Sequence, residues 1–321
     1  MEGNIIRANP FLVIREAAGS IKGNSRACVF LEPLFAIPHT LSMGYMTLYM
    51  LELGVSTTQV GLITSLGLIV HIFFALISTY ITDKLGRRYT SLIFDTFGWL
   101  VPQVIWAVAL DIRFFIVGAI FNASFRVVAN SWTCLLLEDS NPETRVHIFN
   151  FLQIAGILAG FFAPIGALLI NRMTLVPAMR TMLAFGAVSM LTLFIVRHFL
   201  TTETAVGRQK IVEMKDVKMR DVFISYIPIL KRILSDKLMV IALFLRSLNF
   251  IQLTIRTTFL AILVTEGLGF PAEAMAVFHT ITAIVMLITL LLISPCHSEN
   301  SQAVKQGGCR KAKKAITTKN I

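Results

Sequence analysis

The sequence predicts an all-α protein that crosses a membrane several times, and two observations lead to that prediction. Hydrophobic residues make up 55% of the 321 residues and charged residues only 15%, with a mean hydropathy of +0.74. Apolar runs long enough to cross a bilayer core of about 30 Å recur along most of the chain. A water-soluble core cannot bury that much apolar surface, so we expect lipid to be the solvent.

Eight membrane spans fit the hydropathy pattern at about 20 residues per crossing. They cover residues 28–51, 58–82, 89–110, 114–136, 147–170, 178–198, 238–264 and 272–294. We expect a six-helix N-terminal bundle over residues 28–198, a linker over residues 199–237, and the first two helices of a C-terminal bundle over residues 238–294.

Basic residues predict the orientation. Most Lys and Arg fall in the N-terminal segment 1–27, in alternate loops, in the linker and in the tail, whereas the opposite side carries only Arg113, Arg172 and Arg180. By the positive-inside rule, both termini are cytoplasmic. The net charge of +11 therefore reflects membrane topology, and nucleic acid is not an expected partner.

The cysteines are scattered along the chain without a C-x-x-C pair. They are Cys28, Cys134, Cys296 and Cys309. We interpret them as free thiols, and we expect neither a metal site nor a cofactor. No catalytic constellation is expected either, because the sequence has no H-E-x-x-H and no G-x-S-x-G motif.

A weak internal repeat links the two predicted bundles. LGVSTTQV after the first span is similar to LGFPAEAM after the seventh, 215 residues later, which suggests a duplicated architecture. In the linker, Ile211, Met214 and Val217 recur at helical spacing among charged residues. Either a helix on the cytoplasmic membrane surface or a solvated linker helix would have this pattern.

One loop motif connects the sequence to a known family. The loop after the second span reads TYITDKLGRRYT, and it closely resembles the major facilitator signature G-x-L-A-D-R-x-G-R-R between the second and third helices. Gly86 permits a tight turn, while Asp83 at the helix end can pair with a nearby Arg. The matching residues are Asp83, Lys84, Gly86, Arg87 and Arg88.

This resemblance to major facilitator superfamily transporters implies a fold and a function. The fold would be the major facilitator fold, and the chain would move a small solute across the plasma membrane by ion-coupled alternating access. The loop would then act as a conformational latch that stabilises one state of the cycle. The alternative is a basic loop that serves topology only.

Polar residues inside the spans are the candidates for a cavity and for coupling, because a buried Arg costs roughly 2.5 to 3.5 kcal/mol on insertion scales. We expect them to face water, and their excess of Arg suggests an anionic substrate. Arg126 resembles the family's membrane-embedded fourth-helix Arg, and this resemblance implies a coupling proton. In the resembling family, the first, fourth and seventh helices line the cavity. Glu32 and Arg246 could instead snorkel or pair structurally, and His39 could be a packing residue. The candidates are Glu32, His39, Asn122, Arg126, Asn130, Arg246, Asn249 and Arg256.

Four small or rigid residues in the fifth span form a further group. They are Gly156, Gly160, Pro164 and Gly166. They are similar to the family's antiporter motif, but the proline lies three positions late. We therefore favour close helix packing as their role.

The chain changes character after Pro295, where a tail without Leu, Phe or Met follows a span dense in them. We expect the basic tail 295–321 to be non-native, produced by truncation or a frame shift after the eighth span. The alternative is a genuine basic tail that binds anionic lipid. Two further functional alternatives are an incomplete, non-transporting fragment and an eight-span membrane enzyme that acts on lipid.

Overall fold

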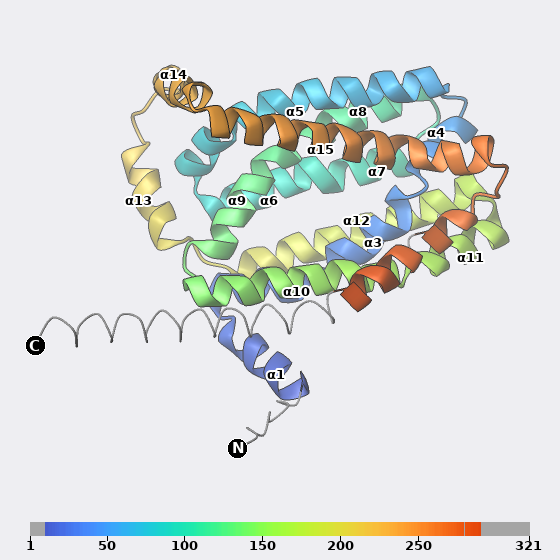
Figure 1. The fold of residues 1–321 in the computed structure, drawn as a ribbon, viewed down its shortest axis with the longest axis horizontal. Coiled ribbons are helices and arrows are strands. Elements are labelled where there is room, and N and C mark those ends of the chain that lie inside the picture. The colour runs from blue at the N-terminus through green and yellow to red at the C-terminus, as the bar shows by residue number, and fades with distance from the viewer. Residues whose placement is uncertain (1–9, 279, 290–321) are drawn as a thin grey trace, which may run out of the picture.

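The computed structural model describes residues 10–278 and 280–289. Within these residues every regular element is a helix, which confirms the predicted all-α class (Figure 1). The predicted change of character after Pro295 and the basic tail lie outside the described residues.

The first two predicted spans differ in regularity. The short helix α1 (Pro10–Ser20) precedes a bent first span, built from α2 (Gly23–Leu31), α3 (Pro33–Met43) and α4 (Met46–Glu52), with a 42° bend before α4. The second span is the single helix α5 (Thr57–Leu85). It begins sharply because the Ser56 side chain and Gln59 form a reciprocal capping box.

Three of the remaining four spans of the N-terminal bundle contain local breaks. The third span consists of α6 (Arg87–Asp95), the π-helical turn η1 (Thr96–Leu100) and α7 (Val101–Ala107). The fourth is divided at Ser124 into α8 (Ile112–Ala123) and α9 (Phe125–Leu137), and the fifth into α10 (Pro142–Gly160) and α11 (Ala163–Met173). The sixth, α12 (Leu175–Leu200), is continuous.

Five described helices are long and apolar enough to cross a membrane, or six if the bent first span is one crossing. The predicted third span is not among them, because polar residues such as Asp95 and Gln103 interrupt its apolar run. The last predicted span is represented by the shorter apolar helix Ala274–Thr289, in which residue 279 is not described. Among the described residues, a helix therefore lies in each of the eight predicted ranges, and eight crossings stay a prediction.

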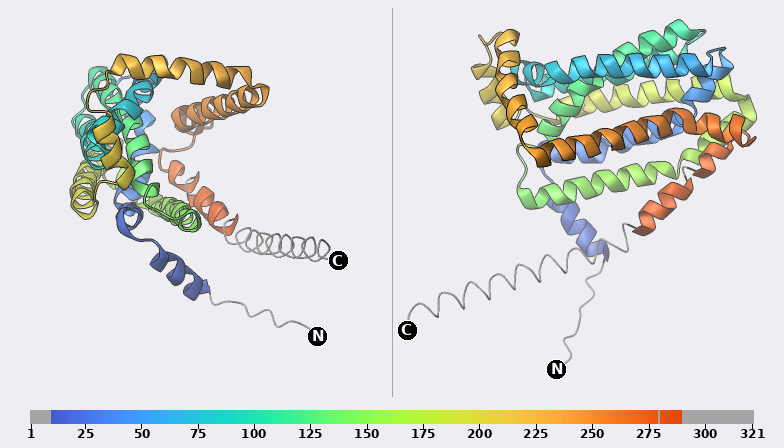
Figure 2. Two further views of the ribbon diagram at one scale, coloured as in Figure 1. Left: turned by 90° about the vertical axis from the view of Figure 1, so that its left-hand side faces the viewer. Right: turned by 45° about the horizontal axis from the view of Figure 1, so that its top comes forward.

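The linker differs from its predicted form. It contains α13 (Ala205–Glu213) and α14 (Met219–Ser235), so the expected helix through Ile211, Met214 and Val217 is interrupted after Glu213. The side chain of Ile211 lies beside the loop at Gly86. α14 runs across the end of the molecule, perpendicular to the spanning helices, and leads into α15 (Lys237–Ile262) (Figure 2).

The repeat has a structural counterpart. Both copies end a helix with a Leu-Gly pair in which the glycine has positive φ, +83° at Gly54 and +72° at Gly269, a conformation that glycine adopts without strain. α15 is followed by the π-helical turn η2 (Leu263–Gly267). Residues 215 positions apart then meet in one buried apolar cluster. The pairs are Met46 and Ala261, Tyr49 and Val264, and Val60 and Met275.

This cluster joins the two halves at one end. α15 packs on α4 and on the first turns of α5, where the Thr47 hydroxyl donates a 2.8 Å hydrogen bond to the Thr258 carbonyl. The opposite end of α5, at Gly86, is about 40 Å away along the helix. On that side every residue of α14 and α15 from 234 to 253 is exposed. The halves are thus in contact at the end far from the Asp83–Arg88 loop.

Candidate functional site

The turn of the loop is set by Gly86. Its φ of +85° lies in the left-handed region, and a Cβ at this position would lie 2.5 Å from Glu203 Oε2 and 2.8 Å from Ile211 Cδ1. A side chain would therefore meet both a strained backbone and the linker. We call residues 83–88 the latch loop.

Arg87 is the centre of the charged contacts. Its guanidinium pairs with Asp83 at 2.9 Å, one helical turn earlier, and donates hydrogen bonds of 2.9 to 3.1 Å to both oxygens of Glu138 at the end of α9. Only 4% of the Arg87 side chain is exposed. The hydroxyl of Thr204, at the start of α13, also donates to Glu138. The Arg87 side chain thus joins α5, α6 and α9.

Glu203 holds the start of α6. Its two carboxylate oxygens accept the backbone N–H groups of Arg87 and Arg88, each at 3.0 Å. These N–H groups have no partner inside the helix, and the positive end of the helix dipole favours a carboxylate there. Residues just after α12 are therefore fixed to the first turn of α6.

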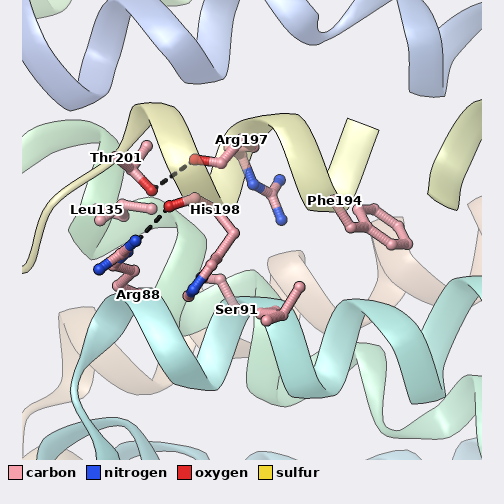
Figure 3. Close-up of a pocket in the computed structure, with 8 residues that line it drawn as sticks. Arg88, Ser91, Leu135, Phe194, Arg197, His198 and Thr201 are labelled. Carbon is pink, nitrogen blue, oxygen red and sulfur yellow. Dashed lines mark hydrogen bonds between the residues drawn. The ribbon is translucent and has the colours of Figure 1, made fainter. Parts of the chain in front are cut away.

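The other two basic residues of the loop have separate contacts. Arg88 Nε donates to the His198 carbonyl at 2.9 Å, which ties the loop to the last turn of α12 (Figure 3). Lys84 is exposed and donates to the Tyr80 hydroxyl at 2.9 Å, and that hydroxyl donates to the Val217 carbonyl at 3.3 Å. Lys84 therefore lies outside the carboxylate network.

The charges of the network stabilise one another. Burial alone would raise the pKa of the Glu138 carboxyl, but the hydrogen bonds from Arg87 and Thr204 lower it below its usual value of 4.5. Burial opposes the charge of Arg87, yet the bond and the charge of Glu138 raise the Arg87 pKa. Both groups are thus held in their ionised forms at neutral pH.

The sequence motif predicted Asp83 and the basic residues of this network, but not the two glutamates Glu138 and Glu203. Glu138 lies at the end of a span and Glu203 just after another, both on the side that is rich in Lys and Arg. Carboxylates at those positions on the basic side are the signal that could have pointed to them, because a buried arginine needs a partner.

The two candidate asparagines of the fourth span donate hydrogen bonds to neighbouring helices. Asn122 Nδ2 donates to the Gly98 carbonyl of η1 at 2.8 Å, and Asn130 Nδ2 to Thr82 Oγ1 of α5 at 3.4 Å. The helix breaks at Ser124 between them, so the two amides face different neighbours. They connect helices instead of lining one cavity face.

Arg126 is half-buried between aromatic rings. Its guanidinium lies 5.2 Å from the centre of the Phe125 ring and 5.6 Å from that of Phe250 on α15, distances at which cation–π attraction operates. Arg126 thus contacts the C-terminal half through Phe250. Arg246, Asn249 and Arg256 are exposed on α15.

In the first span, His39 packs among aromatic rings, with its ring centre 5.2 Å from Phe35 and 5.6 Å from Trp99. Glu32 lies at the junction of α2 and α3 and lines a cavity. Asp95, the last residue of α6, also lines this cavity and forms a buried ion pair with Arg197 of α12. The Arg197 side chain is 7% exposed and that of Asp95 is 4% exposed.

The glycines of the fifth span have unequal surroundings. A Cβ at Gly166 would lie 3.2 to 3.4 Å from Tyr45, Leu41 and Met182. At Gly156 it would meet no atom of the described chain within 4 Å. Gly160 is buried and Pro164 is exposed. Close approach therefore occurs at Gly166 and not at Gly156.

Comparison with known proteins agrees with this geometry. The family model of the Major Facilitator Superfamily matches residues 34–297. The chain belongs to this superfamily. Membership identifies a membrane transporter family and not an enzyme family, so the lipid-acting enzyme is removed as an alternative, and it agrees with a multi-pass helical protein.

One curated relative of this major facilitator protein is named "Uncharacterized MFS-type transporter YqjV", from Bacillus subtilis (strain 168). The two sequences are 26% identical over 128 residues, which are 39% of this chain and 31% of the relative. The match thus spans about a third of the relative's length.

Proposed function

We propose that this chain carries out secondary transport of a small solute across the plasma membrane by ion-coupled alternating access. In this proposal both termini are cytoplasmic, residues 28–198 and 238–294 belong to opposing bundles, and residues 199–237 join them on the cytoplasmic side. The polar residues of the first, fourth and seventh spans, apart from the helix-connecting Asn122 and Asn130, lie on the solute path.

The observation that supports the proposal most is the one-ended contact between the halves. Repeat-related residues such as Tyr49 and Val264 pack together at one end, while α15 between residues 237 and 253 is exposed towards the other. Rocking of one repeat against the other about such a contact is how transporters built from repeats alternate access. The arrangement corresponds to a state open on the latch-loop side.

The latch loop provides a means of biasing that movement. Asp83 and Glu138 share one guanidinium through different nitrogens, and Arg87 thereby connects α5, α6 and α9. A change in the partner of Arg87 would therefore alter the positions of three helix ends together. In this proposal the loop stabilises one conformational state, and neutralising Asp83 shifts the balance between states.

Distances between spin labels test the proposal. Labels at Thr79 of α5 and Lys237 of α15, both exposed, report the separation of the halves on the latch-loop side. We expect two distance populations whose ratio changes in Asp83→Asn and not in Asp216→Asn, a neutralisation on the exposed linker. A single population that is unchanged by Asp83→Asn would refute alternating access governed by this loop.

A further inference from the structure

A cavity of ≈ 180 Å³ lies inside the N-terminal bundle, between the first, third, fourth and sixth spans. Asp95 lies eight residues into its helix from Arg87, or about 12 Å from the latch loop, so the cavity is in the half of the bundle near that loop. An apolar cavity of about 150 Å³ holds a benzene molecule. The walls are mainly aromatic, with Phe35, Trp99, Phe125, Trp132 and Phe194.

Three charged side chains also line this cavity. Asp95 and Arg197 neutralise one another in their ion pair. Glu32 has no side-chain hydrogen bond and no ion pair among the described residues, although it lies close enough to Arg197 to interact with its charge. The lining thus has one carboxylate more than it has cations, and a buried carboxylate without a partner is costly.

The remaining arginines of the spans do not supply the missing charge. Arg126 lies between the Phe125 and Phe250 rings, and Arg246 and Arg256 are exposed on α15. None of the three lines the cavity. The anionic substrate considered from the sequence therefore does not fit this cavity, since its charge would meet an unpaired carboxylate.

We propose that this cavity binds a small organic cation, namely an aromatic ammonium compound. Glu32 is the counter-ion of this ligand, and the indole rings of Trp99 and Trp132 contact its ammonium group or its aromatic ring. An unpaired carboxylate and the faces of aromatic rings together recognise such a ligand. The inference rests on the proposed transport function and names the substrate class.

Equilibrium binding tests this site without requiring transport. Purified full-length chain in lipid nanodiscs is titrated with radiolabelled benzylammonium, with benzyl alcohol as its neutral isostere and benzoate as its anionic analogue. We expect benzylammonium to bind in preference to both. Glu32→Gln should weaken benzylammonium binding about 10-fold to 100-fold, as expected for a lost charge-assisted contact, and should leave benzyl alcohol binding unchanged.

Two further variants distinguish a loss of the binding site from a loss of folding. Glu52→Gln, an exposed glutamate at the end of α4, is the matched control and should bind benzylammonium like the parent chain. Ala129→Phe places a ring at an exposed position of the cavity lining and should abolish binding of both benzylammonium and benzyl alcohol. Retained benzyl alcohol binding in Glu32→Gln shows that this variant is folded.

The proposal is overturned if benzylammonium does not saturate, if benzoate binds as tightly, or if Glu32→Gln binds benzylammonium like the parent. Absence of saturation would leave Glu32 as a proton-binding group only. Because these measurements do not depend on flux, failed binding with intact alternation of the halves rejects the cation site alone. Binding without alternation rejects the transport mechanism alone.

Discussion

Glu138→Gln is the most informative perturbation of the latch loop, because it changes the charge of one partner of Arg87 and keeps its shape. The parent pair has three contacts of 2.9 to 3.1 Å, and the Arg87 side chain is 4% exposed. Hydrogen bonds to charged groups contribute roughly 1.5 to 3 kcal/mol. A buried charge that loses its partner costs about 3 to 5 kcal/mol.

The expected loss lies at the lower end of these ranges, at about 2 kcal/mol of unfolding free energy, for two reasons. Asp83 remains paired with Arg87 at 2.9 Å, and the Glu138 side chain is 17% exposed, so solvent replaces part of the contact. Unfolding by SDS in mixed micelles, followed by circular dichroism, measures the change. Glu143→Gln, on an exposed turn of α10, is the control and should change stability by less than about 0.5 kcal/mol. Equal effects of the two variants would refute the assignment of Glu138 as a partner of Arg87.

Three further predictions concern the same helix ends and the buried ion pair. Gly86→Ala should lower unfolding free energy by about 1 to 3 kcal/mol, because the new methyl meets Glu203 at positive φ, whereas Gly156→Ala, into open space, should not lower it; similar losses in SDS unfolding would contradict this. Asp95→Asn leaves Arg197 without its charge partner and should cost about 3 to 5 kcal/mol, measured in the same assay; a neutral effect would argue against the pair. The folded-state pKa of Glu138 lies below 4.5, so its stabilising contribution should be complete above about pH 4.5 and lost as the pH falls through that lower value. Glu138→Gln should remove this acid-dependent part of the stability profile, and an unaltered profile would contradict it.

The fold class and the position of the latch loop could be predicted from the sequence, because both are encoded locally. Apolar runs indicate the spans, and Asp83, Gly86 and Arg87 lie within one short contiguous motif. The repeat was also detectable, since Gly54 and Gly269 must both be residues that adopt positive φ.

The partners of these residues could not be predicted, because they come from distant segments. Arg87 and Glu138 are 51 positions apart, and Arg197 and Asp95 are 102 apart, so hydropathy and spacing give no information on their pairing. The partners of Asn122 and Asn130 likewise lie on other helices, and periodicity along one helix does not identify them.

Solute-driven proton movement through this chain is the measurement that tests the transport function most directly. Proteoliposomes containing the 321-residue chain and an internal pH dye are exposed to gradients of organic cations, neutral solutes and anions. We predict proton movement with at least one solute, lost in Asp83→Asn and retained in Asp216→Asn. Inserted, folded protein that moves no more protons than empty liposomes with any solute would contradict the proposal and favour a non-transporting fragment.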